Sequence, residues 1–580
     1  MRRLLILLLP VPLLAQAVDI SIPDLRSVMA LGRSELAPVV ERWQADRSAL
    51  GRRYSVEYSP VRIERMRRFH SGWLGALDAL PYSGLSRPAQ VDAVLLGNRL
   101  RRELAQLDRD VGLAAQMQAT LPFADTLYVI LEERRQLVRP DPATAARRIA
   151  WMTTALQQAR SRISAALESR AGRPSPIVAL RAAGVVSDLR REFGNWRRFY
   201  VEYDPEIAWW LAEPAGRFDK ALEEWQTFLR ERLVGVRPGQ DEPIVGDPIG
   251  RSGLLEDLAN EMIAYTPEEL LEVAEREFAW LENEARRAAR DMGLGDDWKA
   301  ALERTRNDHP PVGGQTAAVR DMAWEAVEFV EKRDLVTVPP LALEVWRMEM
   351  MSAEAQKTNP FFLGGEVIQV ASPTSGQTDE EKAMALRANN YHYSRATVHH
   401  ELIPGHHLQG FAAQRNGSSY RGIFSTPFYT EGWALWWEIH LWNLDFPRTP
   451  ENRMGMLFWR MHRAARIIFS LRFHLGEWTP EQCIDFLVDR VGHERASATG
   501  EVRRSFNGNY SPLYQAGYLL GGMQLRALHA ELVSTGRMSE REFHDAVLAT
   551  GQMPIELVRA TLRPELPLSR DGKATWRFAD

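Results

Sequence analysis

The chain has 580 residues, of which 45% are apolar and 26% are charged, and its formal net charge is −4. This composition excludes a disordered or fibrous chain, and the near-neutral charge gives no reason to expect nucleic acid as a partner. The single cysteine, Cys483, excludes an intrachain disulfide framework and a multi-thiolate metal site. Any bound metal would therefore be held mainly by histidine and carboxylate side chains.

Residues 1–17 have the features of a signal peptide. Two arginines precede an apolar run over residues 4–14, and an A-x-A-like cleavage site ends at Ala17. The alternative is a membrane anchor or a misassigned start codon, but the run is short for a membrane-spanning helix, and no cysteine follows it to accept a lipid. We expect a secreted, periplasmic chain that starts near Val18 and has no membrane-spanning segment, because no later stretch offers about 18 consecutive apolar residues.

Three further regions follow along the chain. Residues 18–234 form an N-terminal helical region, in which apolar residues recur at spacings of three and four, most clearly over 91–113 and 144–171. Residues 235–253 are rich in proline and glycine and lack this periodicity, which indicates a linker or a surface loop. Residues 254–580 are again mostly helical. The expected fold class is therefore mainly α.

Local signals divide the last of these regions. The clearest helix start is a capping box formed by Thr266 and Glu269, which predicts a helix running to about Met292. Two stretches rich in β-branched residues, 335–338 and 366–370, instead predict short strands. We expect them to form a small β-sheet just upstream of a histidine-rich segment.

That segment, H-H-E-L-I-P-G-H-H over residues 399–407, carries the most chemical information. It begins like the zinc-hydrolase signature H-E-x-x-H, in which two histidines at i and i+4 share a helical face and the glutamate is the general base. Position i+4 from His400 is Pro404 instead, and the next histidines are His406 and His407. A continuous helix would place His406 on another face and His407 about 10 Å along the axis, too far for one zinc ion.

Pro404 and Gly405 offer a way to loop out two residues. Proline has no N–H for the carbonyl of His400 and its ring clashes there, while glycine adopts backbone conformations that other residues resist. Such a loop would return His406 to the place that i+4 normally occupies, with His407 as the alternative ligand. The other interpretation is a histidine-rich helix end without a metal.

A catalytic zinc needs a third protein ligand, and the helical segment T-E-G-W-A-L-W-W-E over residues 430–438 supplies a candidate in Glu431. Glu438 lies at i+7 on the same face, where it can hold a ligand histidine through the free ring nitrogen. Carboxylates among tryptophans are costly to bury without a partner, and a metal would be such a partner. The tryptophans themselves are more often core residues than a substrate platform.

Together, H-H-E-L-I-P-G-H-H-L-Q and E-G-W-A-L-W-W-E resemble the hallmark segments of the bacterial domain-of-unknown-function 885 (DUF885) family. That family is similar to the gluzincin metallopeptidases: thimet-type oligopeptidases, Taq-type carboxypeptidases and angiotensin-converting enzyme. The resemblance covers most of the mature chain and implies a two-lobed helical fold with zinc deep in a cleft. A motif lengthened by one residue still binds zinc in the dipeptidyl-peptidase III family, so the insertion of two residues is compatible with a zinc site.

Carried over to this chain, the resemblance implies that His400, His406 and Glu431 bind zinc. It also implies that Glu401 is the general base and that Glu438 supports the site. The lengthened motif leaves open which of the two adjacent histidines, 406 or 407, is the second ligand.

A later segment, Y-S-P-L-Y-Q-A-G-Y, is similar to the tyrosine- and glycine-containing segment that such oligopeptidases bring over the zinc. Tyr514 and Tyr518 are the candidates to donate a hydrogen bond to the oxyanion of the tetrahedral intermediate, with simple aromatic packing as the alternative. Arg503 or Arg504 can pair with the C-terminal carboxylate of a peptide, although surface arginines are the commoner case.

We therefore expect a secreted zinc metallopeptidase that hydrolyses short peptides, in which Glu401 takes a proton from water and passes it to the leaving amine. The limit to short peptides comes from the resemblance, because a deep cleft excludes folded proteins. An extended peptide could also pair with a strand edge over residues 364–372, which is otherwise a structural hairpin. The alternatives are a zinc hydrolase of non-peptide amides or esters and an inactive peptide-binding protein, and Glu401 argues against the second.

Overall fold

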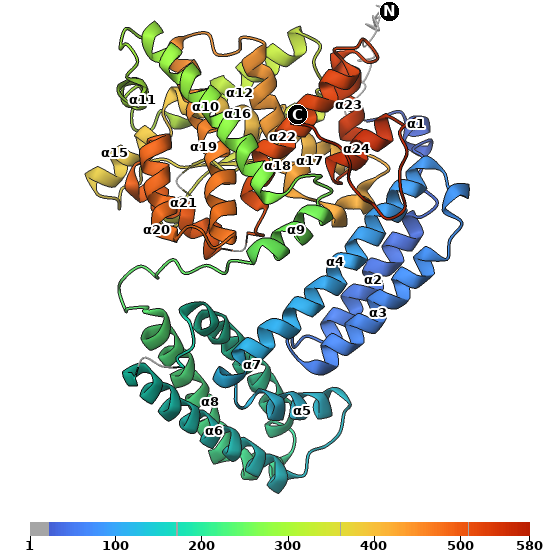
Figure 1. Ribbon diagram of the computed structural model, residues 1–580, viewed down its shortest axis with the longest axis vertical. Coiled ribbons are helices and arrows are strands. Elements are labelled where there is room, and N and C mark those ends of the chain that lie inside the picture. Colours follow the sequence, from blue (N-terminus) through green and yellow to red (C-terminus); the bar gives the residue numbers. More distant parts are fainter. Residues whose placement is uncertain (1–21, 170–171, 360, 509, 580) are drawn as a thin grey trace, which may run out of the picture.

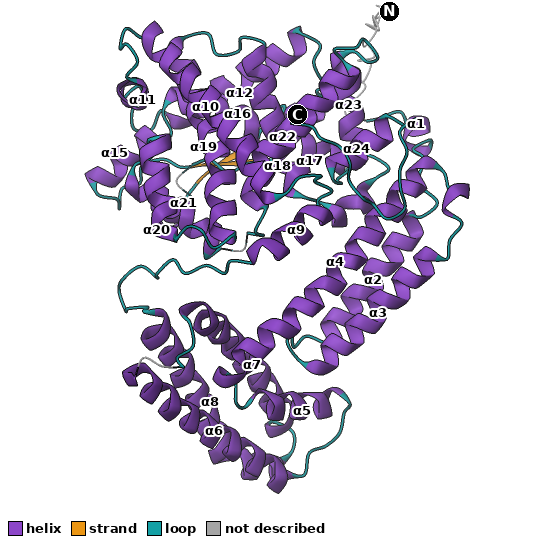
Figure 2. Cartoon of the chain, in the orientation of Figure 1, coloured by secondary structure: helices purple, strands orange, loops and turns teal. Residues whose placement is uncertain are grey.

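The computed structural model describes residues 22–169, 172–359, 361–508 and 510–579, so the expected signal peptide, residues 1–17, lies outside the described residues. The described chain is almost entirely helical with one small sheet, as the sequence predicts (Figure 2). None of its helices combines the length and the apolar character needed to cross a membrane.

One hydrophobic core lies within residues 117–234, which we call the distal body (Figure 1). Its centre is aromatic: the ring of Phe193 meets that of Phe218 edge-on at 5.0 Å between centroids. After the distal body, an irregular linker over residues 235–249 leads back to the rest of the chain. The elements of the distal body are η2 (Gln118–Thr120), α5 (Ala124–Arg135), α6 (Pro142–Ser169), α7 (Pro176–Val201), α8 (Pro205–Phe228) and η3 (Leu229–Val234).

A second and larger core joins the first helices of the chain to everything after the linker, and we call this assembly the main body. The long helix α4 (Arg87–Met117) contributes its first half to this core and extends to the distal body (Figure 1). The other early elements are α1 (Leu25–Met29), α2 (Ala37–Arg53), α3 (Pro60–Asp78) and η1 (Tyr82–Gly84). After the linker come α9 (Gly250–Asn260), α10 (Pro267–Asp291), α11 (Trp298–Arg306), α12 (Gln315–Lys332), α13 (Pro340–Val345), β1 (Arg347–Met350), α14 (Ala353–Thr358), β2 (Val367–Val370), α15 (Asp379–Ala388), α16 (Tyr391–Glu401), α17 (His406–Ala413), η4 (Ser419–Phe424), α18 (Pro427–Asn443), α19 (Pro450–His474), α20 (Pro480–Phe486), η5 (Leu487–Val491), α21 (Arg495–Phe506), α22 (Tyr514–Leu532), α23 (Glu540–Ala549) and α24 (Ile555–Leu562).

Local sequence signals account for where many of these helices begin. The capping box predicted for α10 is confirmed: the Thr266 side chain accepts from the backbone N–H of Glu269, whose carboxylate accepts from that of Thr266. This exchange satisfies two N–H groups that a helix start otherwise leaves without partners. The helix ends at Asp291, one residue before the expected end.

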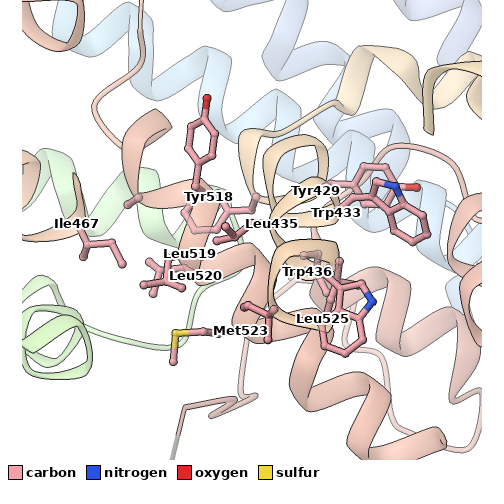
Figure 3. Packing of buried hydrophobic residues seen from close by; sticks show 14 of the residues in the cluster. Tyr429, Trp433, Leu435, Trp436, Ile467, Tyr518, Leu519, Leu520, Met523 and Leu525 are labelled. Atoms are coloured by element: carbon pink, nitrogen blue, oxygen red, sulfur yellow. The ribbon is translucent and has the colours of Figure 1, made fainter. Parts of the chain in front are cut away.

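Helices α18 and α22 pack against each other at the centre of the main body (Figure 3). The contact is close because it is made by glycines: a Cβ added to Gly432 would lie 2.6 Å from the Cα of Gly521. Trp433, Trp436 and Trp437 of α18 are almost fully buried, which confirms that these tryptophans belong to the core. The two helices carry several of the predicted site residues, so their close packing fixes the geometry of the site.

The small sheet consists of β1 and β2, which run parallel with Met348 opposite Ile368. The strand predicted over 366–370 is confirmed as β2, but the one predicted over 335–338 is wrong. Leu335 and Val336 are buried in the core of the main body without a strand partner, and Pro339 follows closely. Their apolar character therefore reflects core packing, since β-propensity is realised only where a neighbouring strand is available.

Candidate metal centre

The histidine-rich segment is not a continuous helix, as Pro404 predicts. Helix α16 ends at Glu401, α17 begins at His406, and the residues between them form a tight loop. The loop needs glycine at position 405, because a Cβ there would lie 1.9 Å from the carbonyl oxygen of His400. The indole of Trp433 fixes it from the other side by donating to the Pro404 carbonyl at 2.9 Å. The two residues looped out thus bring the start of α17 back beside α16.

This loop brings His400, His406 and Glu431 together. One potential ligand atom from each residue lies within 4.8 Å of those from the other two. Glu431 Oε2 is 3.1 Å from Nε2 of His406 and 3.7 Å from Nε2 of His400. Two nitrogens and one carboxylate oxygen converging on one point form a donor set that suits zinc. The three residues come from α16, α17 and α18, so the fold assembles the cluster from separate helices.

His400 is held in place by Glu438. The carboxylate Oε1 of Glu438 lies 2.7 Å from Nδ1 of His400, so the imidazole donates this hydrogen bond and keeps Nε2 free to face the cluster. Arg463 of α19 lies 3.5 Å from the same oxygen and balances the buried negative charge. A carboxylate behind a histidine is the usual support for a metal ligand, and the structure places Glu438 where the sequence predicts it.

The structure separates His407 from His406. Nε2 of His407 lies 2.7 Å from the carbonyl oxygen of Ala342 in α13, to which it donates, and the side chain is 2% exposed. Adjacent residues of a helix point about 100° apart, so only one of these histidines can face α18. The arrangement favours His406 as the residue that completes the cluster.

Glu401, the predicted general base, is the last residue of α16 and lies beside the cluster. Burial raises the pKa of its carboxyl group, against the opposing influence of His400 and His406. The loop before β2 covers it closely: a Cβ added to Gly364 would lie 2.2 Å from Oε2 of Glu401, and Gly365 donates its N–H to the Glu401 carbonyl at 3.2 Å. A raised pKa makes a carboxylate better suited to accept a proton and return it.

The strand edge that the sequence proposes for peptide binding is partly used within the chain. β1 covers one side of β2, and on the other side Gln369 exchanges two backbone hydrogen bonds with Leu363. The hairpin interpretation thus describes this part of the segment, whereas Gly364 acts on the site through its contact with Glu401.

The two predicted tyrosines take different positions. Tyr514 donates its hydroxyl to Oε1 of Glu431 at 2.6 Å, so it holds the carboxylate that faces the histidines. Tyr518 lies parallel to the imidazole of His400, with 6.2 Å between ring centroids. Burial raises the pKa of both phenols, so both keep their protons and remain hydrogen-bond donors. Tyr514 is thus engaged in a hydrogen bond with a cluster carboxylate, whereas the hydroxyl of Tyr518 makes no such bond within the described chain, which favours Tyr518 for the oxyanion role.

The two predicted arginines also differ. Arg503 donates to the Glu242 carbonyl in the linker, so it anchors the linker to α21 and does not join the cluster. Arg504 is largely buried beside Glu501, and its guanidinium lies over the ring of Tyr510 at 5.4 Å. Tyr510 in turn stacks on Tyr514 at 4.1 Å, so Arg504 reaches the site only through two aromatic rings.

Two arginines of α19 lie at the site although the sequence analysis did not predict them. Arg463 and Arg466 are buried, and both guanidiniums lie 4.6 Å from the centre of the Tyr518 ring. Arg466 is paired with Glu501 at 2.7 Å. Their spacing of three residues in α19 was the available signal, but the helix contains other arginines, and the same spacing is common on solvated helix faces.

The protonation states of the cluster are set by its carboxylates. Burial alone would lower the pKa of His400, but its hydrogen bonds with Glu431 and Glu438 outweigh burial and raise the pKa to about 9. The two histidines hold the pKa of Glu431 well below its usual range despite burial. A metal that binds here must displace a proton from His400, so its affinity falls as the pH falls.

A cavity of about 950 Å³ opens elsewhere, between the end of α2 and helices α5 and α7. Its lining includes arginines from both α2 and α5, and none of the predicted site residues is among the residues that line it. The deep cleft expected over the metal is therefore not this cavity.

Comparisons with known proteins give the family and the fold. The family model described as "Bacterial protein of unknown function (DUF885)" matches residues 46–562. A solved structure titled a "putative lipoprotein of unknown function from Shewanella oneidensis" is similar, with a TM-score of 0.68 and 17% identity over 91% of this chain and 100% of that chain. A "putative lipoprotein from Colwellia psychrerythraea" has a TM-score of 0.55 and 16% identity over 88% and 91% of the two chains. No curated protein matches, and none of these matches is a gluzincin peptidase, so that similarity stays a prediction.

Proposed function

The chain belongs to this bacterial family of unknown function, and from its site we propose that it is a zinc-dependent hydrolase of short peptides. The observation that carries the proposal is the convergence of His400, His406 and Glu431 beside Glu401. A glutamate between two histidine ligands is not needed for metal binding alone. Its presence favours a catalytic site over a purely structural one.

The donor set fits a zinc ion held by three side chains, with His400 oriented by Glu438. When bound there, zinc would polarise the carbonyl that is attacked and lower the pKa of water. Glu431 offers Oε2 to the histidine side, while its other oxygen accepts from Tyr514. Tyr514 thereby fixes the orientation of this carboxylate.

The remaining roles fall to side chains next to the cluster. Glu401 accepts the proton of the attacking water and returns it to the leaving amine, for which its raised pKa is suited. Tyr518 donates a hydrogen bond to the oxyanion that forms during attack. Arg463 and Arg466 lie against its ring and hold it in place, and their positive charge favours a developing negative charge nearby.

The choice of peptides as substrates rests on the resemblance of the two motif segments to the gluzincins. The secreted, periplasmic location belongs to the same proposal, and the lipoprotein titles of the structural neighbours support an extracytoplasmic setting. In that setting short peptides are available as substrates.

The test combines metal content with turnover. Wild type, Glu401→Gln and the exposed control Glu380→Gln are purified, their zinc is measured by mass spectrometry, and each is incubated with a peptide library. We expect all three to hold zinc, and we expect Glu401→Gln to lower kcat by about 10²- to 10⁴-fold because the general base is lost. Zinc-free wild-type protein, or full activity of Glu401→Gln, would contradict the mechanism. Cleavage of amide or ester metabolites without cleavage of peptides would replace the substrate class.

A further inference from the structure

A second cluster of histidine and carboxylate side chains lies in the main body, apart from the site described above. It consists of His440 in the last turn of α18, His529 in the last turn of α22 and Glu540 at the start of α23. One potential ligand atom from each residue lies within 4.8 Å of those from the other two. No step of the proposed hydrolysis uses these residues.

The distances match those between ligands of one ion. Oε2 of Glu540 lies 2.9 Å from Nε2 of His529 and 3.2 Å from Nε2 of His440. Two ligand atoms at about 2.0–2.1 Å from a tetrahedral zinc ion are separated by roughly 3.3 Å. Both histidines thus offer the same ring nitrogen to the same carboxylate oxygen, and the three atoms converge.

The burial of His440 gives an independent reason to expect a ligand. Its side chain is 5% exposed, and Nε2 has no hydrogen-bond partner although the Glu540 oxygen is near. Burying a polar nitrogen without a partner costs free energy. The ring of Trp436 stacks on His440 at 4.7 Å and keeps the nitrogen aimed into the cluster. A coordinated cation would satisfy this nitrogen.

A fourth histidine nearby, His544, is excluded as a ligand by its hydrogen bonds. Its Nδ1 donates to the carbonyl of Leu335 at 2.8 Å, and its Nε2 accepts from the indole of Trp436 at 2.9 Å. Both ring nitrogens are therefore used, and His544 serves as packing behind the cluster. With three protein ligands, and with Glu540 30% exposed, water has access to complete the coordination.

We propose that His440, His529 and Glu540 form a second binding site for a divalent transition-metal ion, with zinc as the expected occupant. Imidazole nitrogens and one carboxylate are the ligands that zinc prefers over calcium or magnesium. The site joins the C-terminal ends of α18 and α22 to the N-terminal end of α23. Its role is structural, because no general base accompanies these ligands in the way that Glu401 accompanies the first cluster.

The position of the second site links it to the first. His440 follows Glu431 by nine residues on α18, which corresponds to about 14 Å along the helix. His529 lies on α22, the helix that carries Tyr514 and Tyr518. An ion at the second site therefore clamps the far ends of the two helices that position a ligand and both tyrosines of the first site.

The test measures zinc per chain in the full-length protein after dialysis, with His406→Ala as the background in which the first cluster is disabled. We expect this variant to retain about one equivalent of zinc, and we expect the added Glu540→Gln substitution to remove it. Glu542→Gln is the matched control, because it lies on the same helix and glutamine preserves its capping bond with Ser539. Retained zinc in Glu540→Gln, or equal loss in Glu542→Gln, would overturn the proposal.

A second measurement guards against loss of folding. Added zinc should raise the Tm of the His406→Ala protein but not of the His406→Ala/Glu540→Gln protein, with unchanged helical circular dichroism in both. His529→Ala, at a side chain that is 14% exposed, should repeat the effect of Glu540→Gln. An equal zinc-induced rise in Tm for all variants would contradict a site at these residues. The result is independent of the first site, since that site is disabled throughout.

Discussion

The distal body and the main body are built from similar helices but bury different side chains. Among residues 117–234, Thr120 is the one polar residue in the buried set of the described chain, and the sequence of this stretch contains no histidine. The main body buries histidines, glutamates and arginines, including the cluster around His400. Burying such groups is costly unless they are paired, and their concentration coincides with the candidate metal ligands of the main body.

The two bodies also differ in where the large cavity and the candidate metal ligands lie. The cavity of about 950 Å³ lies against the distal body, whereas the cluster of potential ligands lies in the packed centre of the main body. A search by cavity size alone would lead to the distal body and away from the candidate ligands. The proposals place both metal sites in the main body and none in the distal body. Paired substitutions, one in each body or one at each of two similar residues, can test this.

The largest expected effect is a difference in metal content and activity between substitutions of the two adjacent histidines, His406 and His407. We expect His406→Ala to lose the metal of the first site together with activity, because one of three ligands is removed. We expect His407→Ala to keep both and to lose about 1–3 kcal/mol of stability, since the Ala342 carbonyl loses its donor. Metal analysis, turnover and denaturant unfolding measure these effects. The opposite pattern of metal loss would reverse the ligand assignment.

The next largest effect is a loss of stability confined to the distal body. Phe193 is fully buried there, and we expect Phe193→Ala to destabilise this body by about 3–5 kcal/mol while zinc content stays unchanged. Phe199→Ala, at a half-exposed ring of the same helix, is the control and should have a small effect. Calorimetry with parallel metal analysis checks this. Loss of zinc in Phe193→Ala would show that the two bodies are not independent.

Acid should act on the main body first. Burial lowers the pKa of His70 and His474 to about 4 and that of His493 to about 3. Between pH 6.5 and these values the unfolded chain binds protons that the folded chain does not, so stability falls as the pH falls, by about 1.4 kcal/mol per pH unit for each histidine. The distal body has no histidine and should unfold at lower pH. Hydrogen exchange between pH 7 and 4 resolves the order, and simultaneous unfolding would argue against it.

The smallest expected effect compares two glycines. Gly364→Ala places a methyl group against Glu401, so we expect kcat to fall by about 10²-fold while zinc is retained. Gly184→Ala in α7 of the distal body meets open space and should leave activity unchanged and raise stability by about 0.5–1 kcal/mol. Steady-state kinetics and thermal unfolding measure the pair. Equal activity of the two variants would show that Gly364 does not position the base.

The sequence predicts those features that depend on local chemistry. The capping box at Thr266 and the break at Pro404 follow from residue types and short spacings. The grouping of His400 with Glu431, 31 residues later, was expected mainly from the resemblance of the two motif segments to a known family. The strand β1 was missed because its residues, R-M-E-M, have little β-propensity and become a strand only by pairing with β2. That pairing is a tertiary contact and leaves no periodic signal.

The site residues that the sequence could not predict also depend on tertiary contacts. The spacing alone could not choose between His406 and His407, because the choice depends on where α17 begins after the loop. Arg463 and Arg466 were missed because their burial arises from helices that pack around α19 on all sides, which no local pattern reveals. Arg503 was proposed for substrate but binds the linker, a segment more than 250 residues earlier in the chain.

The glycine contact between α18 and α22 has a consequence for anyone who wishes to rebuild this centre in another protein. A methyl group at Gly432 would fall 2.6 Å from Gly521, and one at Gly521 would fall 2.0 Å from the carbonyl oxygen of Phe428. Grafting the histidines and glutamates onto a generic helical bundle would set the two axes too far apart for Tyr514 to reach Glu431. The minimal transferable unit therefore includes two residues that have no functional group at all.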